Sequence, residues 1–485
     1  MDDMDAMEVS DDDKIPERLP KFNFYSYCVK NRSLSRRSNR LLPQQKEALE
    51  KLCQWFDPVS KNKDKIALVS MPTGSGKTGI ISCLPYFLGS IGLTKNESNT
   101  AVGHPDYPFK QPVLVIAPNL AISKQLEEQL SVLQSGSIDQ PFLIRRKIVP
   151  QNMHKEVLPT AIRIERTDQL KSQYALEKFD MIIANAQKFS ASKANAQTLP
   201  DSKECEDATW EELPDNMFQL VMVDEAHHHP AQTWQKIVQK FKGQAQIVFF
   251  TATPYRGDRK KVLEDTPLAF HLPLNKAVAD GIIRQTKFEQ LEHNDDLKNI
   301  RIRNHDGYEK KQIHNMGRMV TVLRRVKDLL VSKNRDHQLP GGVQHMAMAI
   351  AKNVDYANQL LELWNVISPN DAAETYYHEK EEREKKDIMG RLKNNELRLV
   401  IVVQMLLEGF DHPPISIAAI TCKISSPVKF AQFVGRAQRI YRGPEGTREM
   451  NGEADIITHV DYKQRQRYVD LINETLIPED LPKDQ

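Results

Sequence analysis

The sequence predicts an α/β protein made of two tandem units with parallel sheets. Short apolar runs occur in both halves of the chain, at 66–70, 218–223, 346–351 and 399–404, and chemically active residues follow several of them. Continuous apolar runs of this length are typical of parallel strands that are buried on both faces. A chain of 485 residues is long enough for two or three domains.

Composition and charge narrow the classes of protein. Hydrophobic residues make up 40% and charged residues 27%, and no run of about 18 apolar residues is present, so we expect no membrane span. Residues 1–13 carry seven acids and no base, which is unlike a secretory leader or a mitochondrial transit peptide. We therefore expect an intracellular protein, cytoplasmic or nuclear. The five cysteines form no pair motif and suit a reducing compartment: Cys28, Cys53, Cys83, Cys205 and Cys422.

The net charge of +2 hides an asymmetry. Beyond residue 13 the chain has 67 bases against 58 acids, a surplus that suits a phosphate-backbone partner and is equally compatible with a mixed surface. Residues 27–40 contain five bases and no acid. This segment is predicted to be a basic arm for nucleic acid, a nuclear-import signal or simply a solvated leader.

The stretch 70–78 reads Ser-Met-Pro-Thr-Gly-Ser-Gly-Lys-Thr and lies between an apolar run and an apolar helical stretch. This is the context of a phosphate-binding loop, where glycines let backbone N–H groups face phosphate oxygens at a helix N-terminus. Met71 stands where the strict pattern has Gly, and a glycine turn that caps a helix is the alternative. Lys77 is predicted to add positive charge at the outer phosphates, and Thr78 to bind a metal ion. The predicted nucleotide-binding residues are Thr73, Gly74, Ser75, Gly76, Lys77 and Thr78.

Asp224 and Glu225 follow the apolar run 218–223. Ligands of open α/β sheets bind at the carboxyl ends of strands, so this pair is expected beside the glycine loop. Asp224 is predicted to hold a hydrated Mg²⁺ ion and Glu225 to orient or deprotonate the attacking water. The alternative is a strand end with two solvated acids. Together the two motifs predict that the chain binds and hydrolyses a nucleoside triphosphate.

Three consecutive histidines, His227 to His229, follow this acidic pair. A zinc cluster is disfavoured because three consecutive side chains do not converge easily on one ion and no Cys pair lies nearby. His227 is expected to contact the loop after the strand at 247–250, where Thr251 and Thr253 would relay the nucleotide state. Capping of a strand is the alternative role for these threonines.

These motifs, in this order, resemble superfamily 2 helicases of the DEAD/DEAH-like group, and within it the helicase domains of type III restriction enzyme Res subunits. The segment 41–48 resembles the stretch in which a glutamine, here Gln45, reads adenine, although Leu42 and Gln44 depart from the family's usual Arg and Tyr. The segments 113–125 and 180–187 resemble the motifs that contact nucleic acid. The residues that this likeness implies as nucleic-acid contacts are Pro118, Asn119 and Gln187.

The second half carries two further motifs of the same family. Glu408-Gly409-Phe410-Asp411 resembles its coupling motif, with Gly409 and Asp411 at the nucleotide. Residues 432–439 match the pattern Q-x-x-G-R-x-x-R, in which Gln432 serves coupling. The resemblance implies that Arg439 is the arginine finger at the γ-phosphate and that Arg436 is its neighbour. Taken alone, two arginines on a helix would be a solvated basic face.

The resemblance implies two RecA-like domains of the P-loop NTPase kind with an ATP cleft between them. We expect an acidic then basic leader at 1–40, the ATP-binding domain at 41–272, a connecting region at 273–341, the second domain at 342–462 and a C-terminal helix and tail at 463–485. Two polar insertions are predicted at 93–111 and 190–216, and the charged stretch 379–396 is predicted to be a solvated helix with i,i+4 ion pairs.

The activity implied by the resemblance is a nucleic-acid-dependent ATPase that uses ATP and Mg²⁺, a DNA helicase or translocase. DNA is favoured over RNA only by analogy with DNA-acting relatives. The alternatives are the motor of a restriction or defence complex whose protein partner supplies nuclease or specificity functions, an RNA helicase, and a non-catalytic scaffold that binds nucleic acid.

Overall fold

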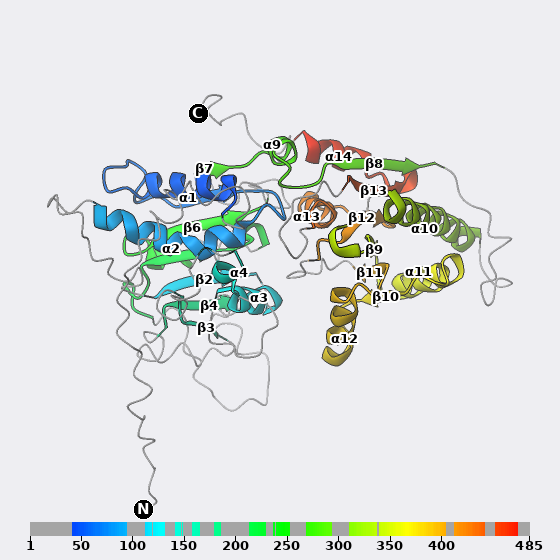
Figure 1. Ribbon diagram of the computed structural model, residues 1–485, viewed down its shortest axis with the longest axis horizontal. Helices are drawn as coiled ribbons and strands as arrows, with labels where there is room; N and C mark the ends of the chain where they lie inside the picture. Colours follow the sequence, from blue (N-terminus) through cyan, green and yellow to red (C-terminus); the bar gives the residue numbers. More distant parts are fainter. Residues whose placement is uncertain are drawn as a thin grey trace, which may run out of the picture.

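The computed structural model of the chain consists of two α/β units, each built on one sheet (Figure 1). The two sheets lie side by side, and helix α13 (Pro427–Ala437) lies on the side of the second unit that faces the first. The structure describes residues 41–94, 112–118, 120–130, 141–146, 148, 158–164, 179–185, 213–228, 236–237, 239–252, 268–292, 310–336, 339–403, 412–441 and 452–473.

The first unit contains a seven-stranded sheet in the order β3-β4-β2-β5-β6-β1-β7. All of its pairings are parallel, as the buried apolar runs predict. Its strands are β1 (Ala67–Ser70), β2 (Val113–Ala117), β3 (Ala161–Ile164), β4 (Met181–Asn185), β5 (Leu220–Val223), β6 (Gln246–Thr251) and β7 (Leu268–His271). The helices that the structure describes in this unit are α1 (Pro43–Trp55), α2 (Lys77–Thr94), α3 (Leu120–Leu130), α4 (Phe142–Arg145) and α9 (Leu274–Ala279).

The second unit contains a six-stranded sheet in the order β10-β11-β9-β12-β13-β8, again with parallel pairings. Its strands are β8 (Thr286–Leu291), β9 (Met346–Ala351), β10 (Ala373–Tyr376), β11 (Leu399–Val403), β12 (Ile415–Ile420) and β13 (Ala454–His459). Its helices, besides α13, are α10 (Lys310–Asp336), α11 (Val354–Ile367), α12 (Glu382–Lys393) and α14 (Arg465–Ile472). The predicted α/β class with parallel sheets is confirmed.

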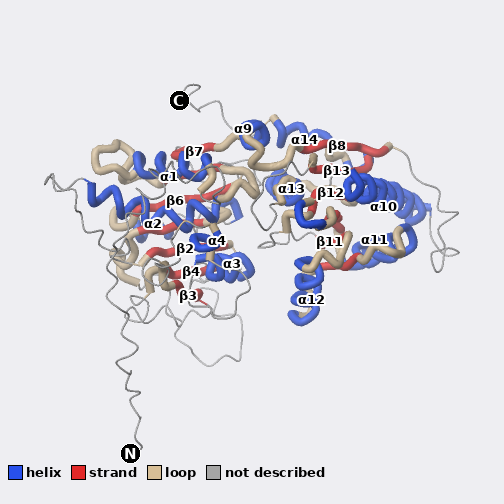
Figure 2. The backbone as a smooth tube through the Cα atoms, in the orientation of Figure 1, coloured by secondary structure: helices blue, strands red, loops and turns tan. Residues whose placement is uncertain are grey.

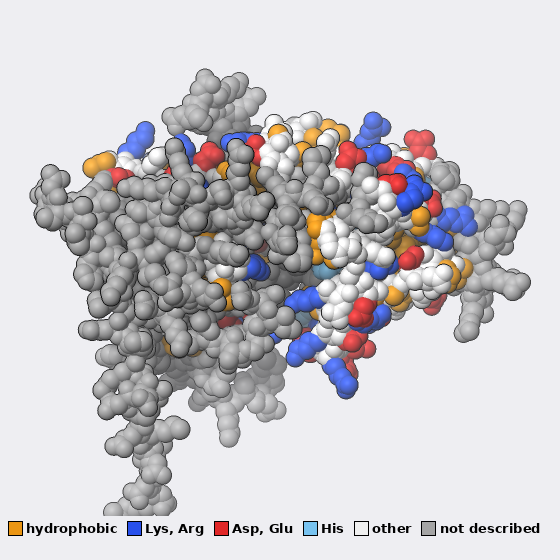
Figure 3. All heavy atoms as spheres, viewed as in Figure 1, with side chains coloured by type: hydrophobic (Ala, Val, Ile, Leu, Met, Phe, Trp, Pro, Cys, Tyr) orange, Lys and Arg blue, Asp and Glu red, His pale blue; other side chains and the backbone are white. Residues whose placement is uncertain are grey.

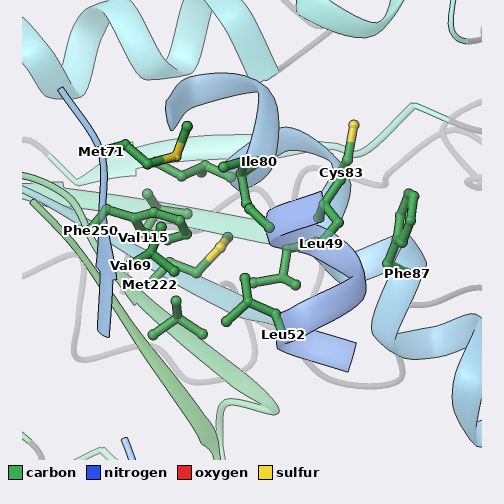
Figure 4. Packing of buried hydrophobic residues seen from close by; sticks show 14 of the residues in the cluster. Leu49, Leu52, Val69, Met71, Ile80, Cys83, Phe87, Val115, Met222 and Phe250 are labelled. Carbon is green, nitrogen blue, oxygen red and sulfur yellow. The ribbon is translucent and has the colours of Figure 1, made fainter. Parts of the chain in front are cut away.

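Each sheet has a core cluster on both faces, and one strand contributes to both clusters because its successive side chains point to opposite sides. In β2, Val113 and Val115 join one core cluster, whereas Leu114 and Ile116 join the cluster on the other face. Strand residues meet the helices α1 and α2 in the first of these clusters, as Figure 4 shows. The residues labelled there are Leu49, Leu52, Val69, Met71, Ile80, Cys83, Phe87, Val115, Met222 and Phe250.

The described residues of 273–341, the predicted connecting region, contribute elements to both units. Helix α9 contributes to the core of the first unit, together with Ile282 and Ile283. Strand β8 pairs along its length with β13, and α10 packs into the core of the second unit. The sequence did not reveal β8, because this edge strand is only partly buried and lacks a continuous apolar run. We therefore propose that the chain crosses between the units at Ile283 and Arg284, since Ile283 packs in the first core and β8 begins at Thr286.

Several other expected elements fall within the described residues. Helix α12 lies in the charged stretch 379–396 and carries an ion pair of Lys385 with Glu382 at 2.9 Å, and both signs of charge are mixed over its surface (Figure 3). Helix α14 lies in the predicted C-terminal helix. The leader 1–40 and most of the two insertions lie outside the described residues. Among the described helices, none combines the length and apolar character needed to cross a membrane.

Candidate functional site

The glycine loop connects β1 to the first turn of α2, as predicted. Gly74 and Gly76 have φ angles of +82° and +101°, which glycine adopts without the strain that a side chain would cause. The hydroxyl of Ser75 donates to the carbonyl of Pro72 at 2.6 Å, which tightens the turn. Lys77 opens α2, whose first turn contains no acidic residue. The loop therefore directs a helix N-terminus toward the end of β1, an arrangement that favours a phosphate group.

Two glutamines of α1 bind the carbonyl groups of this loop. The Gln44 amide donates to the carbonyl of Ser75 at 3.0 Å, and the Gln45 amide donates to the carbonyl of Gly76 at 2.8 Å. Gln45 also accepts a hydrogen bond from the backbone N–H of Leu42 at 2.8 Å. The φ of +101° favours glycine at Gly76, and an ideal Cβ there would lie 2.5 Å from the Gln45 amide nitrogen, so a larger residue would also displace this side chain. Gln45 thus supports the loop in this structure, and its role in reading adenine stays a prediction.

Lys77 and the acidic pair meet, as their positions at neighbouring strand ends suggest. Lys77 is 8% exposed, and its Nζ lies 3.3 Å from Oε1 of Glu225. The same Nζ donates to the carbonyl of Met71 at 3.4 Å. Asp224 directly follows β5, and its backbone N–H donates to the carbonyl of Ile116 on β2 at 2.8 Å. One buried cation and two carboxylates therefore share the edge where the strands end.

The electrostatics at Asp224 suit a divalent cation. Burial, and secondarily the charge of Glu225, raise the pKa of Asp224 to about 7, while Lys77 and the backbone N–H of Glu225 partly oppose the shift. A bound cation would offset this penalty, because it stabilises the charged carboxylate that burial disfavours. Thr78, in the first turn of α2, offers the hydroxyl that the glycine-loop pattern assigns to Mg²⁺. The residues present therefore fit a magnesium ion.

Replacing Asp224 with Asn should stabilise the protein at alkaline pH. In the folded state Asp224 keeps its proton up to a pKa of about 7, whereas its ordinary value is 3.8, so its contribution to stability falls as pH rises from about 4 to about 7. In magnesium-free buffer the Asn variant should therefore unfold at a higher temperature than wild type at pH 8, and this difference should be clearly smaller at pH 5. Thermal unfolding at both pH values measures this. A difference in unfolding temperature that does not change with pH would contradict the raised pKa of Asp224.

Glu225 has a left-handed backbone, with a φ of +47°. This conformation is uncommon for a residue other than glycine and costs of order 1 kcal/mol. Strained residues of this kind cluster at functional sites, where the surrounding structure holds them. The turn aims the Glu225 carboxylate at Lys77 and also at His227, whose Nδ1 lies 3.6 Å from Oε2 of Glu225.

His227 joins the two units. Its Nδ1 lies 2.8 Å from the hydroxyl of Thr251, at the end of β6, and its Nε2 lies 2.8 Å from the amide nitrogen of Gln432 on α13. Because the Gln432 amide nitrogen can only donate, His227 Nε2 accepts, and the neutral ring then carries its proton on Nδ1. The side chains of His228 and His229, and residue Thr253, lie outside the described part. The predicted contact of His227 with Thr251 is present.

Helix α13 packs directly on the glycine loop. An ideal Cβ on Gly435 would lie 2.7 Å from Cβ of Thr73, and one on Gly74 would lie 2.7 Å from Cγ of Arg439. Arg436, in the last turn of α13, is 8% exposed. Gly435 faces Thr73, and Gly74 faces Arg439, so the missing side chains let the backbones of the two units approach each other. Arg439 therefore lies against the loop that is predicted to hold the phosphates.

Replacing Gly435 with Ala should separate α13 from the glycine loop. The new methyl group would meet Cβ of Thr73 at 2.7 Å, which real contacts do not allow. A misplacement of about 1 Å costs about 100-fold in rate, and we expect a loss of kcat of this order. Gly390→Ala is the matched control, because a Cβ on Gly390 of α12 meets nothing within 4 Å. Steady-state ATP hydrolysis compares the two; a Gly435→Ala enzyme as fast as the control would contradict this packing.

Of the remaining predicted site residues, the structure describes only Pro118, which follows β2 and is buried. Five others lie outside the described residues: Gly409, Asp411, Thr253, Asn119 and Gln187. The nucleic-acid contacts thus stay predictions. The contact that sequence reasoning missed is that of Gln44, and no spacing rule could have found it, because it depends on how α1 docks against the loop 31 residues away.

The first unit matches a known protein family. Residues 38–256 match the family described as "Type III restriction enzyme, res subunit". The chain is 23% identical over 386 residues to a protein named "Putative helicase 22" of Sulfolobus islandicus filamentous virus. The aligned region covers 77% of this chain and 58% of that protein. It is 24% identical over 253 residues to DNA 3'-5' translocase XPB2 of Sulfurisphaera tokodaii, covering 46% of this chain and 56% of that one. The chain thus spans little more than half the length of these relatives.

Solved structures share the fold. The crystal structure of the helicase MrfA bound to DNA and AMPPNP covers 94% of this chain and 53% of its own, with a TM-score of 0.54 and 12% sequence identity. The TM-score shows a common architecture. At this low sequence identity the match says nothing about chemistry, so the chemistry of the site rests on the residues described above.

Proposed function

We propose that this chain, a superfamily 2 helicase protein whose residues 38–256 form a Res-like domain, is an ATPase that nucleic acid stimulates and that moves along it. The observation that carries the proposal is the convergence of the glycine loop, the acidic pair and Arg439, which follows α13, at one place between the two units. A fold alone would not support it, since similar folds serve many functions. The set of side chains has the parts that phosphoryl transfer needs.

The chemistry follows from where these groups lie. The loop N–H groups and Lys77 would hold the phosphates, and Asp224 with Thr78 would hold Mg²⁺, which when bound neutralises charge on the phosphate oxygens. Glu225 would orient the attacking water and accept its proton. Arg439, which already contacts the glycine loop, would stabilise negative charge that grows in the transition state. The reaction thus requires both units to be in contact.

The contact of His227 with Gln432 supports coupling between hydrolysis and movement. His227 follows the acidic pair by two residues, and its ring reaches the second unit through a hydrogen bond of 2.8 Å. Loss of the γ-phosphate would change the surroundings of Glu225 and, through it, of His227. The two units would then separate and rejoin once in each cycle, which shifts one unit along a bound strand.

Steady-state ATP hydrolysis tests the function. The full chain is assayed without polymer and with single-stranded DNA, double-stranded DNA or single-stranded RNA, with Glu225→Gln as the blank. We propose DNA as the track, supported by the DNA-acting relatives. Stimulation by DNA alone is therefore expected, and stimulation by RNA alone would overturn this choice. No hydrolysis with any polymer would favour a scaffold or a missing partner.

The description of the matched family favours a second candidate, the motor of a restriction complex that acts with a protein partner. Such a motor would translocate on duplex DNA without separating its strands. Displacement of a third strand from a DNA triplex, compared with unwinding of a tailed duplex, distinguishes the two. Triplex displacement without unwinding supports the restriction motor, whereas unwinding supports a helicase.

A further inference from the structure

Arg284 lies where the chain passes from one unit to the other. Ile282 and Ile283, directly before it, belong to the core of the first unit, and β8, which begins at Thr286, is the edge strand of the second. Figure 2 shows this crossing between α9 and β8. A residue at this position is connected covalently to both units, so its contacts influence how they sit together.

The backbone of the crossing pairs with the segment that directly follows α13 and contains Arg439. The N–H of Arg284 donates to the carbonyl of Gln438 at 2.6 Å, and Ile283 forms an antiparallel bridge with Arg439. Gln438 and Arg439 directly follow α13, which ends at Ala437. The backbone of Arg439 is therefore held by the crossing segment, while its side chain faces Gly74.

The guanidinium of Arg284 connects two further segments. Its Nη1 donates to the carbonyl of Ala437 at 3.0 Å and to that of Ile415 at 2.8 Å, and its Nη2 donates to the carbonyl of Pro413 at 3.1 Å. Ala437 is the last residue of α13, and Ile415 begins β12. One side chain, which is only 2% exposed, thus ties the end of α13 to the start of a central strand.

Arginine is suited to this position for two physical reasons. Its planar fork of N–H groups reaches three carbonyls at once, whereas a lysine ammonium is a single point donor. Its positive charge also favours the C-terminal end of a helix, where backbone carbonyls lack partners within the helix. Burial lowers the pKa of Arg284 to about 9, so the group still carries its charge at neutral pH.

We propose that Arg284 is a positioning residue for the reaction: it holds the segment after α13 so that Arg439 reaches the phosphates. This inference rests on the proposed ATPase function. Arg284 acts on the position of Arg439 and does not contact the nucleotide. It therefore governs kcat and leaves ATP affinity unchanged, because the glycine loop and Lys77 belong to the first unit.

The experiment compares Arg284→Lys, Arg284→Met, Arg439→Ala and the double variant Arg284→Met/Arg439→Ala in the full chain. The control is Arg325→Met, which removes an ion pair of 2.9 Å to Glu289 on β8 and leaves α13 untouched. We expect Arg284→Met to lower kcat about 100-fold, the effect of a displacement of about 1 Å, with an unchanged dissociation constant for a fluorescent ATP analogue. Arg284→Lys should recover part of the loss, and Arg325→Met should match wild type.

The double variant separates positioning from general damage. If Arg284 acts through Arg439, the double variant should be no slower than Arg439→Ala alone. Effects that multiply, or a folded Arg284→Met enzyme with wild-type kcat, would overturn the proposal. If Arg284→Met does not fold, Arg284→Lys is used, and a wild-type kcat in that variant would also overturn it.

Hydrogen exchange distinguishes this proposal from the proposed function, because it needs no turnover. In the folded Arg284 variants the amides of residues 437–441 should exchange about tenfold faster than in wild type, whereas those of α2 should not change. A chain that hydrolyses no ATP but shows this exchange pattern keeps the structural role of Arg284 and loses the ATPase proposal. Unchanged exchange at 437–441 rejects the role of Arg284 whatever the ATPase result.

Discussion

Glu225→Gln should reduce ATP turnover by about 10²- to 10⁴-fold, the usual contribution of a general base, while ATP still binds. The side chain keeps its size and its position beside Lys77, where the carboxylate lies at 3.3 Å, but it can no longer take a proton from water. With hydrolysis blocked, the γ-phosphate stays in place, and the two units should remain closed on bound nucleic acid. Single-turnover hydrolysis and polymer binding in the presence of ATP measure both effects.

Lys77→Ala provides the contrast to this variant. Loss of the lysine removes positive charge from the loop, so both nucleotide binding and turnover should fall. A Glu225→Gln enzyme that turns over at the wild-type rate would contradict the base assignment, and a Lys77→Ala enzyme with unchanged binding and turnover would contradict the phosphate loop. Two variants that behave alike, with ATP binding lost in both, would show that Glu225 acts mainly by holding Lys77 in place.

Arg439→Ala should lower kcat by about 10³- to 10⁵-fold, the range that arginine fingers contribute in phosphoryl transfer. Nucleotide affinity should change much less, because the guanidinium interacts most strongly with charge that develops in the transition state. The rate of ATP hydrolysis and the dissociation constant of an ATP analogue are measured on the same preparations.

Arg439→Met is the matched control for packing. The stem of Arg439 contacts Gly74, and Met keeps an apolar stem of similar length without the charge. If charge is what matters, Met and Ala should be equally slow. A Met variant close to wild type in kcat would show that Arg439 serves to pack the two units together, and the finger would then have to be another residue, with Arg436 as the first candidate.

The site residues were predictable in proportion to how local their signal is. The glycine loop and the acidic pair each occupy one short segment between a buried strand and the next element, so residue order alone identifies them. The three bases with the strongest assigned roles, Lys77, Arg436 and Arg439, also sit in local patterns. What local patterns could not show is that Gln44 and Gln45 both hold the loop through its carbonyls.

The boundary between the units shows the same limit. Strand β8 was not expected because its six residues alternate poorly and lie at a sheet edge, where burial is partial. Its place is decided by pairing with β13, which is far along the chain. The proposed crossing point at Ile283 and Arg284 depends on that pairing. The residues around it show none of the Pro, Gly or Ser enrichment that is typical of a linker.

Residue patterns alone predict the fold class, the chemistry available at the strand ends and the order of the motifs, because strand burial and phosphate-loop geometry depend on neighbouring residues. Which groups meet follows from how distant segments pack. His227 and Gln432 are 205 residues apart, and Arg284 reaches a carbonyl 153 residues away. Such contacts depend on how two separately packed sheets face each other, and this relation is a property of the assembled surfaces that no local pattern encodes.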